Sequence, residues 1–444
     1  MTNETNSREI VLDILMEILE KGTLSHLVLN QALMKYQYLE KQDRAFITRI
    51  TEGTLEYLIR IDAVLGNYSK TPVGKMKPLI RTLLRMSVYQ ILYMERVPDS
   101  AVCNEAVKLA KKRKFQGLSG YVNGVLRTVS REKHSLCFED PSVRYSIPAW
   151  MLSMWEKTYG RKTAERIAAS FLEDRPLSVR CNVSRQSVSD TVKSLEAQHI
   201  SAERSPLLDT VLYLRDYDYP EAIHAFQDGA ITVQDVSSAL VGIAAAPEKG
   251  NFVLDICSAP GGKALHMADL MEGSGMVEAR DLTEYKTGLI EENIIRCGFS
   301  NIRTRVWDAT VPDPELSGKA DIVLADLPCS GLGIIGKKPD IKMRLRETDL
   351  DGLAELQRKI LSVASGYVKP GGTLIYSTCT IDKKENEENA DWILETLPFI
   401  KKEITPLLPK NLAADCEGNR IQLLPGIHGC DGFFIAAFEK KRVF

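Results

Sequence analysis

Two of the nine cysteines lie in short segments that directly follow apolar, strand-like stretches. Cys329 ends the segment Asp326-Leu-Pro-Cys, and Cys379 lies within Ser377-Thr-Cys-Thr380. A cysteine thiolate forms readily near neutral pH and is a strong nucleophile, so either residue is suited to covalent catalysis. A single cysteine is more often an inert buried thiol. Two cysteines at the ends of neighbouring strands, with an aspartate beside them, favour a covalent catalytic site instead.

A tight glycine turn joins a predicted strand to a predicted helix in the same half of the chain. The strand Val253–Ile256 leads into the turn, and a helical pattern runs from Ala264 to Met271. The turn consists of Cys257, Ser258, Ala259, Pro260, Gly261, Gly262 and Lys263. Adjacent glycines let the backbone approach a ligand closely, and the first N–H groups of a helix are free to meet an acceptor. The spacing matches neither GxGxxG nor GxxxxGKS/T, so it favours neither a dinucleotide nor the phosphates of ATP.

Two aspartates follow the next strands along the chain. Asp281 ends the next predicted strand, 20 residues after Gly261, where an acid can bind both hydroxyls of a ribose. Asp308 follows another short strand, in the position of an adenine contact. A Pro-Gly-Gly turn alone can be an ordinary turn, and Lys263 alone can be a solvated helix residue. Together with the two aspartates, however, the turn predicts a site for a nucleoside-containing cofactor.

Three regions with different patterns divide the chain. Over residues 1–135, apolar residues recur at helical spacing and proline is almost absent, which predicts an all-α bundle. Residues 142–228 mix helical and strand-like segments and predict a small α+β domain. Residues 229–444 alternate apolar strands with helices. This alternation predicts an α/β, Rossmann-like, doubly wound parallel sheet, which binds ligands at the carboxyl ends of its strands.

The composition excludes several classes of protein. With 44% apolar and 26% charged residues, the chain is neither collagen-like nor of disordered composition. No apolar run approaches the roughly 18 residues of a membrane span, and the start of the chain lacks the pattern of a signal peptide. We therefore expect a cytoplasmic protein with no membrane partner. The cysteines form no CxxC pair, so we expect no metal site, and the net charge of −2 means that any nucleic-acid surface is local.

The three chemical motifs, taken together, resemble those of a known family. The blocks Asp255-x-Cys-x-Ala-Pro-Gly-Gly-Lys263, Asp326-x-Pro-Cys-Ser-Gly331 and Ser377-Thr-Cys-Thr380 are similar to the S-adenosylmethionine and catalytic motifs of RNA cytosine-C5 methyltransferases, and they occur in the same order. The resemblance implies that S-adenosylmethionine is the cofactor. It also implies that the cofactor is bound or bordered by Cys257 to Lys263, Asp281, Asp308 and Asp326.

The chemistry of this family requires an activated base. Carbon 5 of cytosine is a poor nucleophile, and addition of a thiolate to C6 activates it. After methylation, a second group must remove the C5 proton so that the thiolate can leave. DNA cytosine methyltransferases use a Pro-Cys cysteine, which would correspond to Cys329, whereas the resembled RNA family uses a Thr-Cys cysteine, which corresponds to Cys379. We expect Cys379 to be the nucleophile, Cys329 to serve product release, and Asp326 to hold N3 and the amino group.

The helical region is similar to the NusB-like RNA-binding module. The resemblance rests on Arg85-Met-Ser-Val-Tyr89 and on the segments 104–111 and 121–126. The combination of this module with the catalytic blocks resembles the Sun or RsmB family of bacterial small-subunit ribosomal RNA methyltransferases over nearly the whole chain. This resemblance implies methylation of one cytosine of 16S ribosomal RNA, and we expect the enzyme to be a monomer. Ser258, Leu327 and Thr380 depart from the usual family pattern, but none of them removes a functional group.

Two basic segments could contact RNA. The run from Lys108 to Lys114 has five cations in seven residues, which suits phosphate contact, but a solvated helix end fits equally well. The segment Ser330 to Asp340 contains two lysines. It predicts either a flexible loop that meets RNA or folds over a flipped base, or a plain surface loop.

Two other functions fit part of the sequence. A non-catalytic RNA-binding factor would need only the helical module, and the intact Cys329, Cys379 and Asp326 argue against it. A transfer-RNA cytosine methyltransferase would share every catalytic residue. Only the helical module argues against that second alternative.

Overall fold

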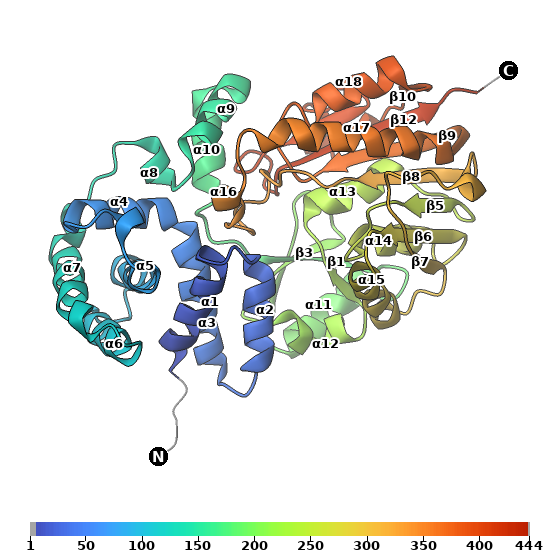
Figure 1. Ribbon diagram of the computed structural model, residues 1–444. Coiled ribbons are helices and arrows are strands. Elements are labelled where there is room, and N and C mark those ends of the chain that lie inside the picture. The colour runs from blue at the N-terminus through green and yellow to red at the C-terminus, as the bar shows by residue number, and fades with distance from the viewer. Residues whose placement is uncertain (1–5, 443–444) are drawn as a thin grey trace. The chain divides into compact units, whose positions relative to one another are not determined.

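The computed structural model describes residues 6–442 and divides the chain into two compact units (Figure 1). Unit 1 contains Met1–Glu173 and also Ile335–Leu345, and unit 2 contains Asp174–Ile334 and Arg346–Phe444. The chain therefore leaves unit 2 six residues after Cys329, contributes a short segment to unit 1, and then returns to unit 2.

Unit 1 is built from helices, as the spacing of its apolar residues predicts. Its first seven α-helices are α1 (Ser7–Leu19), α2 (Ser25–Lys35), α3 (Lys41–Glu56), α4 (Leu58–Tyr68), α5 (Pro78–Tyr93), α6 (Asp99–Lys112) and α7 (Ser119–Glu132). They are followed by α8 (Pro141–Tyr145), α9 (Ala149–Tyr159) and α10 (Arg161–Ser170), and the inserted segment supplies α16 (Ile341–Arg344). Helix α5 packs against α1, α3, α4, α6 and α7, so it forms the centre of the bundle (Figure 1).

The central position of α5 follows from its sequence. Pro78 stands in the first turn, where its missing N–H costs no hydrogen bond, and the helix buries residues on nearly every face. Helix α3 approaches it closely at Gly53, where a Cβ atom would lie only 2.0 Å from the ring of Tyr89. The apolar side chains on α5 thus specify a helix that is enclosed by its neighbours.

Unit 2 begins with a small four-stranded antiparallel sheet. Its strands are β1 (Leu177–Cys181), β2 (Ser201–Arg204), β3 (Val211–Arg215) and β4 (Ile231–Val233), in the order β2-β3-β1-β4. Helices α11 (Val188–Ala197) and α12 (His224–Gln227) belong to the same part of the chain, and Leu195 and Ala225 from these helices share a core with Leu212. This arrangement is the α+β mixture predicted for the middle of the sequence.

The larger sheet of unit 2 has the order β10-β12-β9-β8-β5-β6-β7, with β11 paired to β12. Its parallel strands are β5 (Phe252–Asp255), β6 (Met276–Asp281), β7 (Ile302–Val306), β8 (Ala320–Asp326) and β9 (Val368–Thr378). The antiparallel strands are β10 (Phe399–Lys401), β11 (Arg420–Leu423) and β12 (Phe433–Lys440). The sheet is therefore mixed, because three antiparallel strands extend the predicted parallel part.

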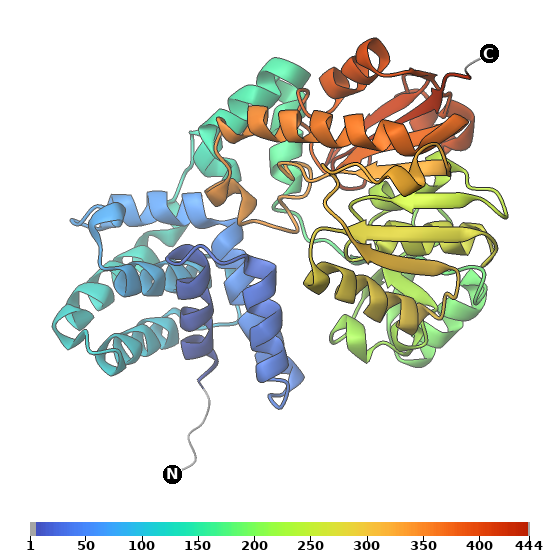
Figure 2. The same cartoon turned by 45° about the vertical axis from the view of Figure 1, so that its right-hand side comes forward.

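Helices cover both faces of this sheet (Figures 1 and 2). One face packs against α13 (Val236–Ala245), α14 (Gly262–Leu270) and α15 (Glu284–Cys297), and the other packs against α17 (Asp349–Tyr367) and α18 (Glu387–Thr396). Neighbouring residues of β5 illustrate this: Val253 belongs to the first apolar cluster and Leu254 to the second. The strand order reverses between β5 and β8, and the carboxyl ends of parallel strands at such a point form a ligand site.

Candidate active site

The two cysteines singled out in the sequence lie next to each other. Strands β8 and β9 are parallel neighbours, and Asp326 pairs with Ser377 in their register. The loops that follow these strands therefore start at the same edge of the sheet. The Sγ atoms of Cys329 and Cys379 are 3.2 Å apart, and both residues are partly buried.

Asp326 is held on both of its carboxylate oxygens. The Lys263 ammonium donates to Oδ2 at 2.6 Å, and the Ser377 hydroxyl donates to Oδ1 at 2.8 Å. Lys263 belongs to the first turn of α14, and its ammonium also lies 5.1 Å from the centre of the Phe433 ring. Because its side chain is only 13% exposed, Lys263 is part of the site and is not a solvated helix residue.

The predicted glycine turn connects β5 to α14. Gly261 has φ of +100°, and a Cβ atom there would come 3.0 Å from a side-chain carbon of Ile290, so the position favours glycine. Two side chains from outside the turn also hold it in place. The Ala259 N–H donates to Oδ2 of Asp281 at 3.0 Å, and the Asn293 amide donates to the Pro260 carbonyl at 3.0 Å.

The polar atoms beneath this turn provide a test of whether a cofactor fits here. Both carboxylate oxygens of Asp255 and the hydroxyl of Ser258 are buried, and they form no hydrogen bond with any group that the structure describes. Burial raises the pKa of Asp255 to about 7. Buried polar atoms without partners are costly unless a ligand satisfies them, so the turn fits a small cofactor with polar groups.

The two remaining predicted cofactor residues lie at the ends of β6 and β7. Besides Ala259, Asp281 accepts hydrogen bonds from its neighbour Leu282 at 2.7 Å and from the Lys286 ammonium at 2.8 Å. Asp308 is exposed, and hydrogen bonds from the backbone and hydroxyl of Thr310 hold the pKa of its carboxyl below the ordinary value. The structure thus links Asp281 directly to the glycine turn, whereas the hydrogen bonds of Asp308 are local.

The surroundings of Cys257 and Cys329 raise the pKa of both thiols, but for different reasons. Burial and the nearby carboxylates of Asp255, Asp281 and Asp326 raise the pKa of the Cys257 thiol, which makes this third cysteine an inert thiol. The interaction with the Cys379 thiol, together with burial and the charge of Glu385, raises the pKa of Cys329. Cys329 therefore keeps its proton beside Cys379.

A buried polar network behind the cysteines was not predicted. It contains Ser330, Gln357, Tyr376, Thr380, Glu385 and Asn389. The sequence did hold one signal, because the segment Asp382-Lys-Lys-Glu-Asn-Glu-Glu-Asn389 follows Cys379 closely. Because so many charged residues stand together, the segment is typical of a solvated helix start. Its sequence therefore does not predict that Glu385 is fully buried.

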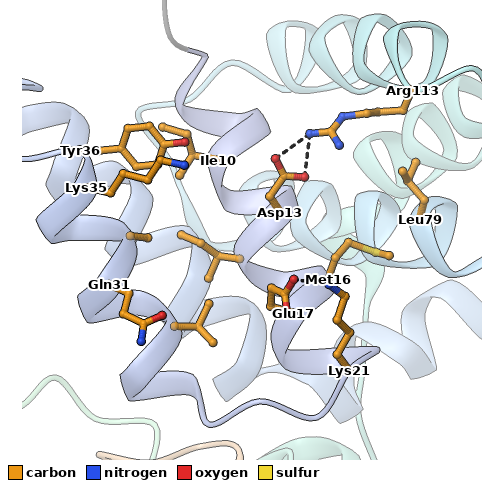
Figure 3. A pocket seen from close by; sticks show the side chains of 13 residues that line it. Ile10, Asp13, Met16, Glu17, Lys21, Gln31, Lys35, Tyr36, Leu79 and Arg113 are labelled. Atoms are coloured by element: carbon orange, nitrogen blue, oxygen red, sulfur yellow. Dashed lines mark hydrogen bonds and ion pairs between the residues drawn. The ribbon is translucent and has the colours of Figure 1, made fainter.

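Most cations of the run Lys108 to Lys114 are engaged inside unit 1. Arg113 pairs with Asp13 at 2.7 Å, Lys112 pairs with Glu9 at 2.6 Å, and Lys108 pairs with Glu105 at 2.7 Å. Arg113 also borders a cavity of about 490 Å³ that is lined mainly by α1 and α2 (Figure 3). Among residues 6–442, Lys111 and Lys114 form no such pair. The charge available to RNA phosphate is therefore smaller than the run suggests.

The segment after Cys329 is anchored, in contrast to the flexible loop expected from its sequence. Asp340 accepts a hydrogen bond of 2.5 Å from the Ser25 hydroxyl, and the Lys342 ammonium donates to the Ser146 carbonyl at 2.9 Å and to the Glu56 carbonyl. Both side chains are buried in unit 1, whereas the preceding lysines at 337 and 338 are exposed. The buried side chains of Asp340 and Lys342 thus hold a segment for which the sequence predicted a flexible or plain surface loop.

Membrane spans and metal clusters are both absent from the part of the chain that the structure describes. Within residues 6–442, no helix is both long and apolar enough to span a membrane. Over the same residues, histidine, cysteine and acidic side chains form no cluster that could hold a metal ion.

Models of three protein families match successive parts of the chain. The NusB family matches residues 5–131, the ferredoxin-like domain of RsmF/B-like methyltransferases matches residues 147–217, and the 16S rRNA methyltransferase RsmB/F matches residues 242–439. Unit 1 therefore contains a NusB domain, and the large sheet of unit 2 belongs to a methyltransferase domain.

Curated proteins and one solved structure are similar to nearly the whole chain, and a second solved structure is similar to about two thirds of it. The chain is 35% identical over 447 residues to the "Probable ribosomal RNA small subunit methyltransferase B" of Bacillus subtilis, with 99% of each chain covered. It is 30% identical to ribosomal RNA small subunit methyltransferase B of Shewanella oneidensis, with 98% of this chain and 99% of the relative covered. The crystal structure of PH0851 has a TM-score of 0.83 at 27% identity, covering 98% of this chain and 99% of that one. The methyltransferase homolog protein from Pyrococcus horikoshii has a TM-score of 0.55 at 26% identity, covering 68% and 98%.

The fold, the glycine turn at the reversal of strand order and these similarities define an S-adenosylmethionine-dependent methyltransferase. The identity of 35% over essentially the full length makes the assignment more specific. The chain belongs to the RsmB/F family of methyltransferases that act on the ribosomal RNA of the small subunit.

Proposed function

We propose that the enzyme methylates carbon 5 of a cytosine in 16S ribosomal RNA through a transient covalent bond between Cys379 and C6. The observation that carries the proposal is the 3.2 Å separation of two thiols at the ends of adjacent strands, beside an oriented carboxylate. A single reactive thiol would suffice for attack on C6. Release of a C5-methylated cytosine also requires a general base, and the second thiol directly beside the first is placed to serve as that base.

Cys379 performs the first step. Its thiolate adds to C6, so a sulfur–carbon bond forms and the C5=C6 electron pair becomes available at C5. Cys329 is a poor candidate for this attack, because its thiol keeps its proton next to Cys379 and Glu385. The protonated state of Cys329 and the motif resemblance both support Cys379 as the nucleophile.

Cys329 performs the last step. Its hydrogen bond with the Cys379 thiol is the largest cause of its raised pKa, and this hydrogen bond is broken when Cys379 is bonded to C6. Cys329 can then lose its proton to water and act as a base. It takes the proton from C5, the C–H electron pair restores the C5=C6 bond, and the C6–sulfur bond breaks to regenerate the Cys379 thiolate.

Asp326 and the glycine turn position the reactants. Lys263 and Ser377 fix both oxygens of Asp326, and the remaining lone pairs can accept hydrogen bonds from the cytosine amino group and from N3 when N3 is protonated. S-adenosylmethionine, when bound, supplies the methyl group. The turn from Cys257 to Lys263 would hold it through backbone groups, with Asp281 at the ribose hydroxyls and Asp308 near the adenine.

We also propose a division of labour among the three regions identified in the sequence. The NusB-like region, residues 1–135, would bind RNA. Residues 142–228 would link it to the catalytic region, residues 229–444. This proposal follows from the helical module and its separation in sequence from the cysteines, and it favours a ribosomal over a transfer-RNA substrate.

Bisulfite sequencing tests the proposed function directly. RNA would be taken from cells that lack the protein and from the same cells complemented with the wild type or with Cys379→Ser. We expect one cytosine of 16S ribosomal RNA to resist conversion only in the presence of the wild type. A protected cytosine found only in transfer RNA would support the transfer-RNA alternative, and protection that is independent of the protein would refute the proposal.

A further inference from the structure

A fully buried glutamate holds the residue that directly follows Cys329. Glu385 lies between β9 and α18, and its Oε2 accepts a hydrogen bond of 3.0 Å from the Ser330 backbone N–H. Its other oxygen accepts a hydrogen bond from the Ser330 hydroxyl. A carboxylate that binds both the backbone and the side chain of one residue fixes the position of that residue and of its neighbour.

The same network reaches the residue that directly follows Cys379. The Oγ atom of Ser330 lies 2.6 Å from Oγ1 of Thr380, and both residues are buried. An ionised carboxylate only accepts hydrogen bonds, so Ser330 donates to Glu385 and Thr380 donates to Ser330. Thr380, Ser330 and Glu385 thus form one directed chain of hydrogen bonds between the two cysteine loops.

Gln357 also forms hydrogen bonds with this chain and with the residue before Cys329. The amide nitrogen of Gln357, on α17, donates to Glu385 Oε2 at 2.8 Å and to the Pro328 carbonyl at 3.0 Å. The Gln357 oxygen accepts hydrogen bonds from the Tyr376 hydroxyl at 3.0 Å and from the Asn389 amide at 2.9 Å. Both flanks of Cys329 are therefore held, and a satisfied buried network of this kind is rigid.

We propose that Glu385 is the positioning residue of the release step: its ionised carboxylate fixes Cys329 against Cys379 through the two hydrogen bonds that it accepts from Ser330. This proposal rests on the proposed role of Cys329. Glu385 is buried and cannot touch the RNA. It would influence the reaction only through Cys329, the residue that removes the C5 proton.

The charge of this acid can change in the working range of pH. Burial raises the pKa of Glu385 to about 7, against the opposing effect of its hydrogen bonds from Ser330. Three other titratable groups lie around it: Cys329 on the loop after β8, Tyr376 on β9 and Asp382 on its own loop. The thiol and the phenol have raised pKa values and stay protonated near neutral pH, and burial also raises the pKa of Asp382. Only the ionised carboxylate accepts on both oxygens, as its hydrogen bonds with Ser330 require, so the release step should accelerate as Glu385 ionises, at about pH 7.

The variant Glu385→Gln tests the proposal because it keeps the shape and removes the charge. Its matched control is Glu388→Gln, the same change at a position on α18 outside the buried network. Each protein would receive 16S RNA and labelled S-adenosylmethionine in a single turnover. Two quantities would be measured between about pH 6 and about pH 8.5: the rate of methyl transfer and the decay of the protein–RNA adduct on denaturing gels.

We expect Glu385→Gln to transfer methyl groups at nearly the wild-type rate, to release product about tenfold more slowly, and to lose the acceleration of release at about pH 7 that comes from Glu385. Glu388→Gln should behave as the wild type. Wild-type release with an unchanged pH profile in Glu385→Gln would overturn the proposal. If that variant fails to fold, Ser330→Ala provides the test, because it removes the hydroxyl link but keeps the backbone N–H; normal release by Ser330→Ala would then count against the proposal.

A parallel measurement on Cys329→Ala separates this proposal from the proposed function. If that variant forms no persistent adduct, the role of Cys329 itself fails. If it forms the adduct while Glu385→Gln releases normally, only the role of Glu385 fails.

Discussion

The Lys263 ammonium lies 2.6 Å from the carboxylate of Asp326, so the first turn of α14 is joined directly to the acid at the end of β8, three residues before Cys329. Both side chains are largely buried, at 13% and 26% exposure, which strengthens their interaction compared with a surface ion pair. In the proposed function, this ion pair would connect the cofactor-binding turn to the residue that recognises the cytosine.

This ion pair leads to a prediction about Lys263→Met and Asp326→Asn. We expect Asp326→Asn to lower single-turnover methyl transfer by at least about a hundredfold, because an amide cannot accept hydrogen bonds from Lys263, Ser377 and the cytosine amino group together. Lys263→Met should reduce the rate less, by about tenfold, since it frees the carboxylate without removing it. Rates at saturating cofactor would be compared with RNA affinity, which should be unchanged. A reduced rate that is fully explained by weaker RNA binding would contradict the assignment.

The second prediction concerns Cys329. Because its thiol is proposed to remove the C5 proton, Cys329→Ala should methylate RNA once and then remain attached to it. The adduct should survive denaturing electrophoresis and carry the label from the methyl donor. Cys137, an exposed cysteine of unit 1, supplies the control: Cys137→Ala should leave only free RNA. If Cys329→Ala gives only free RNA and turns over normally, a group other than Cys329 removes the C5 proton.

The basic run of unit 1 gives a prediction that depends on its ion pairs. Lys111 and Lys114 are the cations that we expect to be available to phosphate, so Lys111→Gln combined with Lys114→Gln should weaken RNA binding and reduce the salt dependence. The slope of log affinity against log salt should become shallower by roughly 0.7 to 0.9 for each phosphate that is no longer neutralised. An unchanged slope would indicate that the run is only a solvated helix end.

Glu9 supplies the opposite test in the same region. Glu9→Gln releases Lys112 and weakens the hold on Arg113, since both cations pair with this carboxylate. If the run contacts RNA, this variant should bind more tightly and show a steeper salt dependence than the wild type. Equal binding would support the view that these cations serve the helical bundle alone.

The sequence predicts the parallel part of the large sheet, because buried strands followed by helices leave an alternating pattern. It does not predict that β11 and β12 extend this sheet, since they follow each other without an intervening helix. The same contrast holds within the site. Cys329, Cys379 and Asp326 stand out through their motifs, whereas Glu385 lies in a charged segment whose burial depends on α17 and on the loop after β8, which are distant from it in sequence.

In the segment 335–345, the local sequence does not predict which lysines are buried. Its lysines at 337 and 338 are exposed, whereas Lys342 is 5% exposed and is surrounded by unit 1. All three residues have the same chemistry and similar neighbours in sequence. What separates them is the position of the carbonyl groups of Glu56 and Ser146, which come from distant parts of the chain.

Lys342 also gives the last prediction. Burial lowers its pKa from the ordinary value to about 7, while the unfolded chain keeps a lysine pKa of about 10.4. Between these two values the unfolded state binds one more proton than the folded state, so the free energy of unfolding increases as pH rises, by roughly 1.4 kcal/mol per pH unit. Below about pH 7 both states are protonated and the burial of the charge reduces stability by its full amount.

The variant Lys342→Met isolates this effect, because methionine fills similar space without a titratable group. Unfolding by urea would be followed at about pH 7 and about pH 9 for both proteins. We expect the wild type to gain stability relative to the variant over this interval, since only the wild type carries the buried amine. Lys338→Met, at an exposed position, should show the wild-type dependence on pH. If wild type and Lys342→Met change in parallel, the ammonium of Lys342 keeps its charge throughout, held by the two carbonyl oxygens, and its pKa is not lowered in the folded protein.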